Sequence, residues 1–571
     1  MLREDFSLTK RHLGWILLVG GIVATLALLS LDPLAALLQR VGSGLVGPDR
    51  SIGVGPRQAL ALLASAATAL VGGSLLPLRG NAVAARPSAW PVAVGRPWAA
   101  LRRVLLALVM AVLLAYLAIY VFYAVNLMLF PFDYDQGEGF ELVDTIMFSQ
   151  FRWPYQNTEV FPFYSSNYPP LFHMIAAPFV WLFGPAYWYG RLLGFLGTLI
   201  TAVAIGYAVY RAERHRTLAA ISGLVFLASN YIYHVGPLFR QHLFMVMFET
   251  LAVVALATVP DMSDRAGRRR ALATGMVFLL AAGYTKQLAV ATCAAVFVWL
   301  FIHNPRRSLV WGLLFAGVAG AIFLLIDRLT GGQWWLNIIS ANVNPFVPGQ
   351  FEGLFRQWFG LHGVLIVMAG LMVIYELYFD RISLYSVWFV AAVLNTVLAG
   401  KWGAGDSYFA TAIAAAAILS GIFAARTVQG SWRFPENYLT RFLQPVRGWL
   451  SVYRGAVIGA AGVVAAGAYL VYAAAVFHLP TEGPVFGAVS DALGVEANTG
   501  FAFYDSAGWT DGYAALGQIP TAEDIENGWR LVAIVAEVQH PGGQDGHRQP
   551  DPASQPVQQW PLRSDRAAHH D

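Results

Sequence analysis

The segment PFDYDQGEGFELVDTIMFSQFRWPYQNTEVFPFYSSNYPPLF, residues 131–172, is a polar stretch that directly follows the long apolar run 104–130. It holds a single arginine, Arg152, against six acidic residues: Asp133, Asp135, Glu138, Glu141, Asp144 and Glu159. Acidic groups beside a membrane helix cost free energy unless water, a cation or a partner compensates them. We therefore predict a functional site in this segment. The alternative is an ordinary solvated loop.

The composition indicates a membrane protein. Of the 571 residues, 57% are hydrophobic and only 12% are charged, whereas soluble proteins have about 25% charged residues. The mean hydropathy is +0.55. Apolar runs long enough to span a bilayer recur along most of the chain. The sequence thus predicts an all-α, polytopic helical membrane protein. The net charge of +4 comes mostly from arginines beside helices, so it indicates topology rather than nucleic-acid binding. The single cysteine, Cys293, excludes an intrachain disulfide.

About thirteen transmembrane helices are expected from runs of roughly twenty apolar residues. They lie near residues 13–31, 57–78, 104–130, 186–210, 217–235, 241–259, 270–285, 287–303, 308–327, 361–379, 384–400, 408–425 and 455–477. The run 168–184 is too short for a span, and its Tyr, Trp and Phe residues favour an interfacial helix on the outer surface.

The basic residues predict the orientation of these helices. They gather in alternate connections: Arg3, Lys10 and Arg11; Arg79, Arg86, Arg96, Arg102 and Arg103; Arg211, Arg214 and Arg216; Arg265, Arg268, Arg269 and Arg270; Arg306 and Arg307; Arg381; and Arg426, Arg433, Arg441, Arg447 and Arg454. Positively charged loops stay in the cytoplasm. The N-terminus is therefore expected inside, and the acidic loop 131–185 and the C-terminus outside.

Four regions are expected along the chain. Residues 1–100 would form two additional helices and a basic cytoplasmic loop, and residues 101–477 the transmembrane core. Residues 478–538 would form a small outer segment with a strand-like stretch at Leu531. Residues 539–571 are polar and rich in Pro and Gln, so we expect them to be disordered.

A set of basic and polar residues lies at the expected outer ends of separate helices: Arg191, Arg240, His242, Lys286 and Lys401, with Asp406 and Tyr408 close behind Lys401. Such cations suit a phosphate at the level of the lipid headgroups. A carboxylate of the acidic loop would act as general base, and the cations would stabilise a departing phosphate. Alternatively, the arginines extend to the interface without binding a ligand, and Asp406 pairs with Lys401.

An ordered set of short motifs resembles the GT-C superfamily of integral membrane glycosyltransferases. Among its members, the chain is most similar in pattern to the protein O-mannosyltransferases and the lipid A aminoarabinose transferase. The matching pieces, which cover about residues 101–426, are DYDQGEGF at Asp133, NYPPLF at Asn167, GRLLGFLGTL at Gly190, FRQHLF at Phe239, YTKQ at Tyr284 and GKWGAGDSYF at Gly400. The chain departs from the pattern at Gln136, and at Gln241 and His242, where relatives often have an acidic residue.

The resemblance implies a polyprenyl-phosphate sugar as donor, inversion at the anomeric carbon and interfacial jaw helices in the first outer loop. It implies a catalytic acid at Asp135 or Asp133, with Glu138 as the next candidate. Lys286 and Arg240 would lie near the donor phosphate. Tyr168, Arg191, His242, Lys401, Asp406 and Tyr408 complete the expected substrate-binding set.

We expect a glycosyltransferase of a prokaryotic inner membrane, with a lipid, glycan or protein acceptor that the sequence does not specify. Asp133, Asp135 and Glu138 offer oxygen ligands for Mg²⁺ or Mn²⁺, but we expect no obligatory metal because cationic side chains already suit the phosphate. Trp334, Trp335 and Trp358 would stack on a sugar or anchor the chain at the interface. The alternatives to an enzyme are a transporter or flippase of a lipid-linked intermediate and a catalytically inactive subunit.

Overall fold

The computed structural model describes residues 95–130, 134–135, 137–160, 164–434 and 454–476. The expected spans at 13–31 and 57–78, Asp133, the strand-like stretch at Leu531 and the C-terminal tail lie outside the described residues. The chain divides into two units, residues 1–519 and 520–571. All described residues belong to the first unit.

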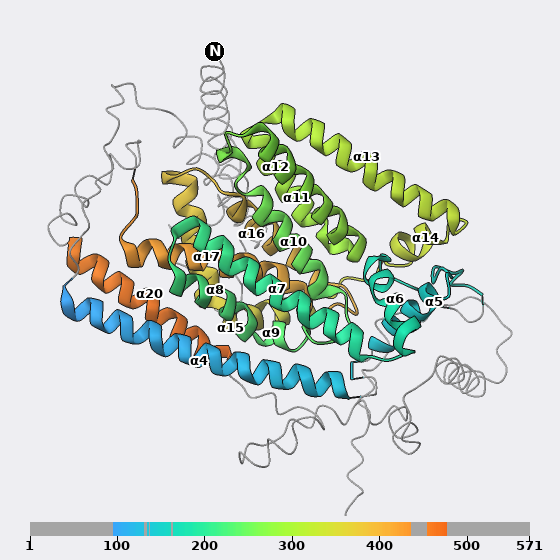
Figure 1. Cartoon of the computed structure of the whole chain (residues 1–571), viewed down its shortest axis with the longest axis horizontal. Coiled ribbons are helices and arrows are strands. Elements are labelled where there is room, and N and C mark those ends of the chain that lie inside the picture. Colours follow the sequence, from blue (N-terminus) through green and yellow to red (C-terminus); the bar gives the residue numbers. More distant parts are fainter. Residues whose placement is uncertain (1–94, 131–133, 136, 161–163, 435–453, 477–571) are drawn as a thin grey trace, which may run out of the picture. The chain divides into compact units, whose positions relative to one another are not determined.

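The described residues form helices, apart from connecting loops and an isolated bridge between Phe346 and Lys401 (Figure 1). The α-helices are α4 (Arg96–Leu129), α5 (Glu138–Ser149), α6 (Leu171–Phe183), α7 (Trp188–Glu213), α8 (Arg216–Ala228), α9 (Asn230–Tyr233), α10 (His242–Leu256), α11 (Arg265–Thr285), α12 (Val290–His303), α13 (Pro305–Leu329), α14 (Gln333–Trp335), α15 (Pro348–Phe379), α16 (Leu384–Asn395), α17 (Ala410–Gln429) and α20 (Arg454–Val476). Short helical turns are η1 (Val259–Asp261), η2 (Gln287–Ala289), η3 (Leu336–Ser340), η4 (Thr396–Gly400) and η5 (Asp406–Phe409).

Seven described helices are long and apolar enough to cross a membrane. They are Arg96–Leu129, Trp188–Glu213, His242–Asp261, Pro305–Leu329, Pro348–Phe379, Asp406–Gln429 and Arg454–Val476. The expected spans at 217–235, 287–303 and 384–400 are formed by shorter apolar helices, and the span at 270–285 by α11, which begins with four arginines in six residues. The chain is a polytopic helical membrane protein.

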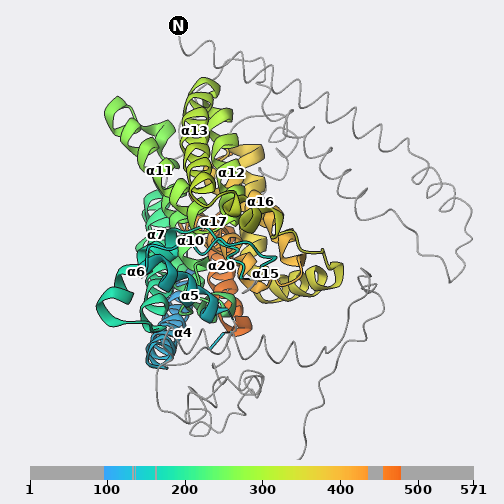
Figure 2. The same ribbon diagram turned by 90° about the vertical axis from the view of Figure 1, so that its right-hand side faces the viewer.

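Helix α17 lies at the centre of the bundle, against α7, α8, α15, α16 and α20 (Figures 1 and 2). Alanine dominates its sequence, and nearly all of its residues are buried. Small side chains let neighbouring helix backbones approach closely, which is how helices associate in a membrane. Helix α13, in contrast, lies at the edge of the bundle, and only Ser308 and Ile326 of it are buried.

The arginine-rich ends of several helices meet at one end of the bundle. Arg426 at the end of α17 forms ion pairs with Glu213 of α7 and with Asp380 after α15. Nearby, Arg102 of α4 donates a hydrogen bond to the Val428 carbonyl. Arg426 therefore links the ends of α7, α15 and α17 at this end of the bundle.

Helices α5 and α6 pack on each other at the opposite ends of these helices (Figure 1). Helix α6 has 13 residues, which is about 20 Å and too short for a hydrocarbon core of about 30 Å. Its last residues, Trp181, Leu182 and Phe183, are exposed. The helix has the length and the exposed aromatic surface of the interfacial helix expected at 168–184.

Candidate active site

The start of α5 is fixed by a buried ion pair between Glu138 and Arg191. The Nε and Nη2 atoms of Arg191 lie 2.9 and 2.6 Å from the two Glu138 carboxylate oxygens. The same carboxylate accepts hydrogen bonds from the backbone N–H groups of Tyr134 and Phe239. Arg191 also donates to the Leu127 carbonyl at the end of α4. Because both side chains are fully buried, this pair joins α4, α5, α7 and the loop before α10.

The position of this pair favours a structural role for Glu138 and Arg191 over the catalytic and substrate-binding roles expected from the sequence. A buried ion pair is tolerated where further hydrogen bonds satisfy the remaining polar atoms, and here the backbone supplies them. Neither side chain has surface with which to contact a substrate.

The loop 234–241 carries Arg240 and packs closely on α7. A Cβ added to Gly194 would lie 2.6 Å from the backbone oxygens of Gly236 and Leu238, so only glycine allows this approach. Arg240 then reaches Asp135 of the acidic loop, with Nε 2.5 Å from a carboxylate oxygen. Each of the two side chains keeps 26% of its surface exposed. Asp135 and Arg240 are thus in contact with each other and partly exposed.

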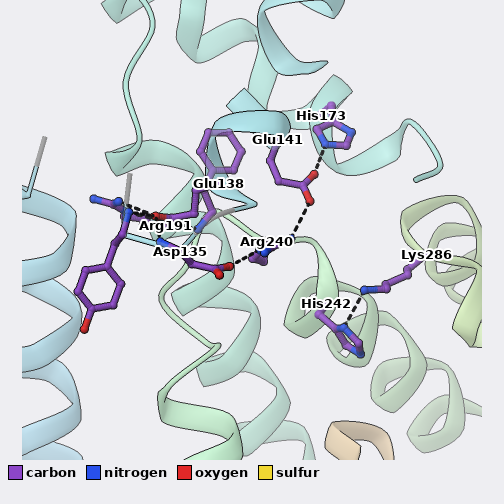
Figure 3. A network of polar contacts seen from close by, with 10 residues as sticks. Asp135, Glu138, Glu141, His173, Arg191, Arg240, His242 and Lys286 are labelled. Atoms are coloured by element: carbon purple, nitrogen blue, oxygen red, sulfur yellow. Dashed lines mark hydrogen bonds and ion pairs between the residues drawn. The ribbon is translucent and has the colours of Figure 1, made fainter. Parts of the chain in front are cut away.

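A second group of buried carboxylates lies behind Arg240. Glu141 accepts a hydrogen bond from His173 Nε2 of α6 at 2.6 Å and lies 3.7 Å from Arg240 Nη1. Asp144, one turn further along α5, accepts hydrogen bonds from the hydroxyls of Tyr164 and Ser166. Figure 3 shows Asp135, Arg240, Glu141 and His173 following one another across the site.

Burial and charge shift the pKa values in this second group. Burial raises the pKa of Asp144 to about 6, against the opposing effects of His173, Ser166 and Tyr164. Burial alone would lower the pKa of His173, but the hydrogen bond and charge of Glu141 and the charge of Asp144 outweigh it and raise that pKa. The two carboxyl groups therefore favour the protonated form of the His173 imidazole.

Lys286, at the end of α11, provides a further buried cation near Arg240. Its ammonium donates to His242 Nδ1 at 2.9 Å and lies over the rings of Tyr168, at 4.7 Å, and Tyr408, at 5.5 Å. Tyr168 also interacts electrostatically with Glu141, Arg240 and Asp135, and Lys286 interacts with Arg240. The structure thus gathers five of the expected residues: Asp135, Arg240, His242, Lys286 and Tyr168, with Tyr408 beside them.

Lys401 and Asp406 lie beside this cluster, but they have different partners. The Lys401 ammonium donates to the Asn342 carbonyl at 2.7 Å, so its hydrogen bond goes to the loop 336–347 instead of to Asp406. Asp406 interacts with His234 and Asp135. Lys401 remains within electrostatic range of Lys286.

Of Trp334, Trp335 and Trp358, which were expected to stack on a sugar or to anchor the chain at the interface, two are buried in the protein. Trp334 packs against Tyr155 and Phe323, and Trp358 packs against Phe409; both are buried in the core. Only Trp335 is exposed. Stacking on a sugar is therefore open to Trp335 alone among these three.

Glu141, Asp144 and His173 were not among the expected site residues. A signal was present, because Glu138, Glu141 and Asp144 follow one another at three-residue spacing, which places them on one face of a helix. His173 directly follows the motif NYPPLF. The contact of His173 with Glu141 depends on how α5 packs on α6, and the spacing of residues along the sequence does not predict this packing.

Two of the three carboxylates considered above as ligands of a divalent cation, Glu138 and Asp135, already have other partners. Glu138 gives both of its oxygens to Arg191 and to backbone N–H groups, and Asp135 pairs with Arg240. Within the described ranges, no group of three or more His, Cys, Asp or Glu side chains is arranged to hold a metal ion.

No family model matches the sequence, and no curated protein matches it. The structure is similar to the crystal structure of ArnT from Cupriavidus metallidurans in the apo state, with 15% sequence identity and a TM-score of 0.43 over 65% of this chain and 76% of that chain. It is also similar to the structure of the same protein bound to undecaprenyl phosphate, with 16% identity and a TM-score of 0.42 at the same coverage. ArnT is the lipid A aminoarabinose transferase named above. Both TM-scores are too low for the likeness alone to establish a shared fold.

Proposed function

We propose that this chain is a GT-C-type glycosyltransferase that moves a sugar from a polyprenyl-phosphate donor to an acceptor hydroxyl. The observation that carries the proposal is the contact between Asp135 and Arg240, with Lys286 close by on a separate helix. A partly exposed carboxylate beside two cations offers both functions that the transfer needs: a base for the acceptor and positive charge for the leaving phosphate.

The proposed reaction proceeds in one displacement. Asp135 takes the proton of the acceptor hydroxyl, and the acceptor oxygen attacks the anomeric carbon from the side opposite the phosphate. The bond between that carbon and the phosphate oxygen breaks, and the polyprenyl phosphate leaves with the electron pair. The configuration is inverted. Arg240 and Lys286 stabilise the negative charge that develops on the phosphate.

His242, Tyr168 and Tyr408 contact Lys286, one of the two cations proposed to bind the phosphate. His242 accepts a hydrogen bond from Lys286 and so holds its ammonium in place. Tyr168 and Tyr408 face the same ammonium with their rings. Asp133 lies outside the described residues and is the second candidate for the base. Because two cations already face the leaving phosphate, transfer would not need a metal, and full loss of activity in EDTA would contradict this.

The charge asymmetry of the helices supports an orientation. Arginine-rich ends remain in the cytoplasm, so the ends that carry Asp135, Arg240 and Lys286 would face the outside of a prokaryotic inner membrane. The acceptor would then be a lipid, glycan or protein on that side.

The proposal is tested by replacing Asp135 in cells. A strain without the protein should lack one glycosylated lipid or glycan, detected by mass spectrometry, and the wild-type chain should restore it. Asp135→Asn should not restore it, whereas Glu159→Gln, an exposed acid of the same loop, should. Full restoration by Asp135→Asn and by Asp133→Asn would remove the proposed base and with it this reaction.

A further inference from the structure

Glu141 is a buried carboxylate placed directly behind Arg240, and the mechanism above gives it no role. It is almost completely buried, and one of its oxygens lies 3.7 Å from Arg240 Nη1. With its amide nitrogen facing Glu141, Gln241 donates to the two carboxylate oxygens at 2.8 and 3.1 Å. His173 contacts the same carboxylate at 2.6 Å. Two neighbours therefore fix the orientation of the carboxylate that faces Arg240.

Arg240 is held on three sides. Asp135 contacts its Nε atom, and Glu141 faces Nη1. On the third side, the guanidinium lies so close to Gly137 that a Cβ there would overlap it, at 2.1 Å from Cζ. The side chain nevertheless stays partly exposed. A guanidinium held in this way keeps one orientation and still has surface for a ligand.

The strength of the attraction between Glu141 and Arg240 depends on the charge of His173. The titratable and charged groups that face this cluster are Glu141 and Asp144 of α5, Tyr155, Tyr164 and Tyr168 of the loop between α5 and α6, Arg240, and Lys286 at the end of α11. While His173 is protonated, Glu141 forms an ion pair with it. When His173 loses its proton, Arg240 and Lys286 are the positively charged groups that still face Glu141.

We propose that Glu141, braced by His173 and Gln241, is a positioning residue that orients the Arg240 guanidinium toward the phosphate of the donor. The inference rests on the proposed function, since it concerns the same phosphate. If Glu141 loses its charge, Asp135 is the one acidic partner left to Arg240. The guanidinium can then rotate, and Asp135 is less available to act as the base. Deprotonation of His173 has a different effect, because Glu141 then competes with the phosphate for Arg240.

The test compares Glu141→Gln with wild type in two measurements. Transfer in the restored strain should fall by about 10- to 100-fold, the range expected for misplacement of a group by about an ångström. As the pH rises through the titration of His173, binding of undecaprenyl phosphate to the purified protein should weaken more steeply in wild type than in Glu141→Gln. The second ionisation of the phosphate is common to both proteins and cancels in the comparison.

Controls separate this inference from folding and from the proposed function. Thr145→Val, which alters a neighbouring buried side chain of α5, should behave as wild type in both measurements. If Glu141→Gln does not purify as a folded protein, His173→Gln serves in its place, because it too should make binding less dependent on pH than in wild type. Wild-type transfer and wild-type pH dependence in Glu141→Gln, with Asp135→Asn inactive, would overturn the inference and leave the proposed function standing.

Discussion

Gly137 lies against the Arg240 guanidinium, which occupies the space that a side chain at residue 137 would fill. Its backbone has an ordinary right-handed helical conformation, so alanine would add no backbone strain. The added methyl group would meet only the far end of a flexible side chain. We therefore predict that Gly137→Ala folds normally but displaces Arg240 from Asp135, and that transfer falls at least about tenfold.

The matched control is Gly283→Ala in α11, where a Cβ would meet no atom within 4 Å. It should keep wild-type transfer and wild-type thermal stability. A Gly137→Ala protein as active as Gly283→Ala would show that the position of Arg240 does not matter to the reaction.

The pair formed by Glu138 and Arg191 is expected to govern stability. Glu138→Gln leaves the Arg191 charge buried without a partner, which costs about 3–5 kcal/mol for a buried pair. Glu352→Gln breaks the exposed pair with Arg356 and should cost less than about 1 kcal/mol. Thermal unfolding in detergent should therefore separate the two variants clearly. Equal unfolding temperatures would mean that the Glu138–Arg191 pair does not hold the start of α5.

At the scale of elements, the packing of α5 on α6 should depend on pH. The folded-state pKa of Asp144 is raised from 3.8 to about 6, so the folded form binds more protons in that window and loses stability as the pH rises through it. The raised pKa of His173 acts in the same direction. Its contribution is complete below the ordinary value of 6.5 and is lost as the pH rises through the folded-state pKa.

Hydrogen–deuterium exchange of peptides from 138–149 and 171–183 measures this effect. After correction for the intrinsic pH dependence of exchange, protection should decrease from pH 5 to pH 8 (roughly the span of these shifts), and Asp144→Asn should flatten the lower part of the curve. Protection that increases with pH over this range would contradict the assigned shifts.

The sequence predicts more of the elements than of the contacts between them. Apolar runs and arginine spacing located the described helices and their charged ends, because those properties depend on local composition. The sequence also led us to expect Asp135 and Arg240 near one another, although not in direct contact. The ion pair between Arg191 and Glu138 was not expected, because the positions of cations along the sequence do not show which cation pairs with which carboxylate. That choice depends on the approach of loop 234–241 to α7 at Gly194, which is a property of the folded chain.

At the scale of the whole molecule, the account requires that Glu159 and Arg265 lie on opposite sides of the membrane. Both are exposed, and the chain has a single cysteine, so Cys293→Ser gives a background for single-cysteine variants. In spheroplasts, an impermeant thiol reagent should label Glu159→Cys and leave Arg265→Cys unlabelled until the membrane is opened. The reverse pattern would place the site in the cytoplasm.

The central claim is that Arg240 and Lys286, borne on separate segments, hold one phosphate beside Asp135. Binding of undecaprenyl phosphate to the purified protein, measured by native mass spectrometry, tests it most directly. Arg240→Gln and Lys286→Met should each weaken binding by at least about tenfold, as expected for loss of a charge-assisted hydrogen bond, whereas the exposed Arg356→Gln should not. Wild-type affinity in both site variants would contradict the account.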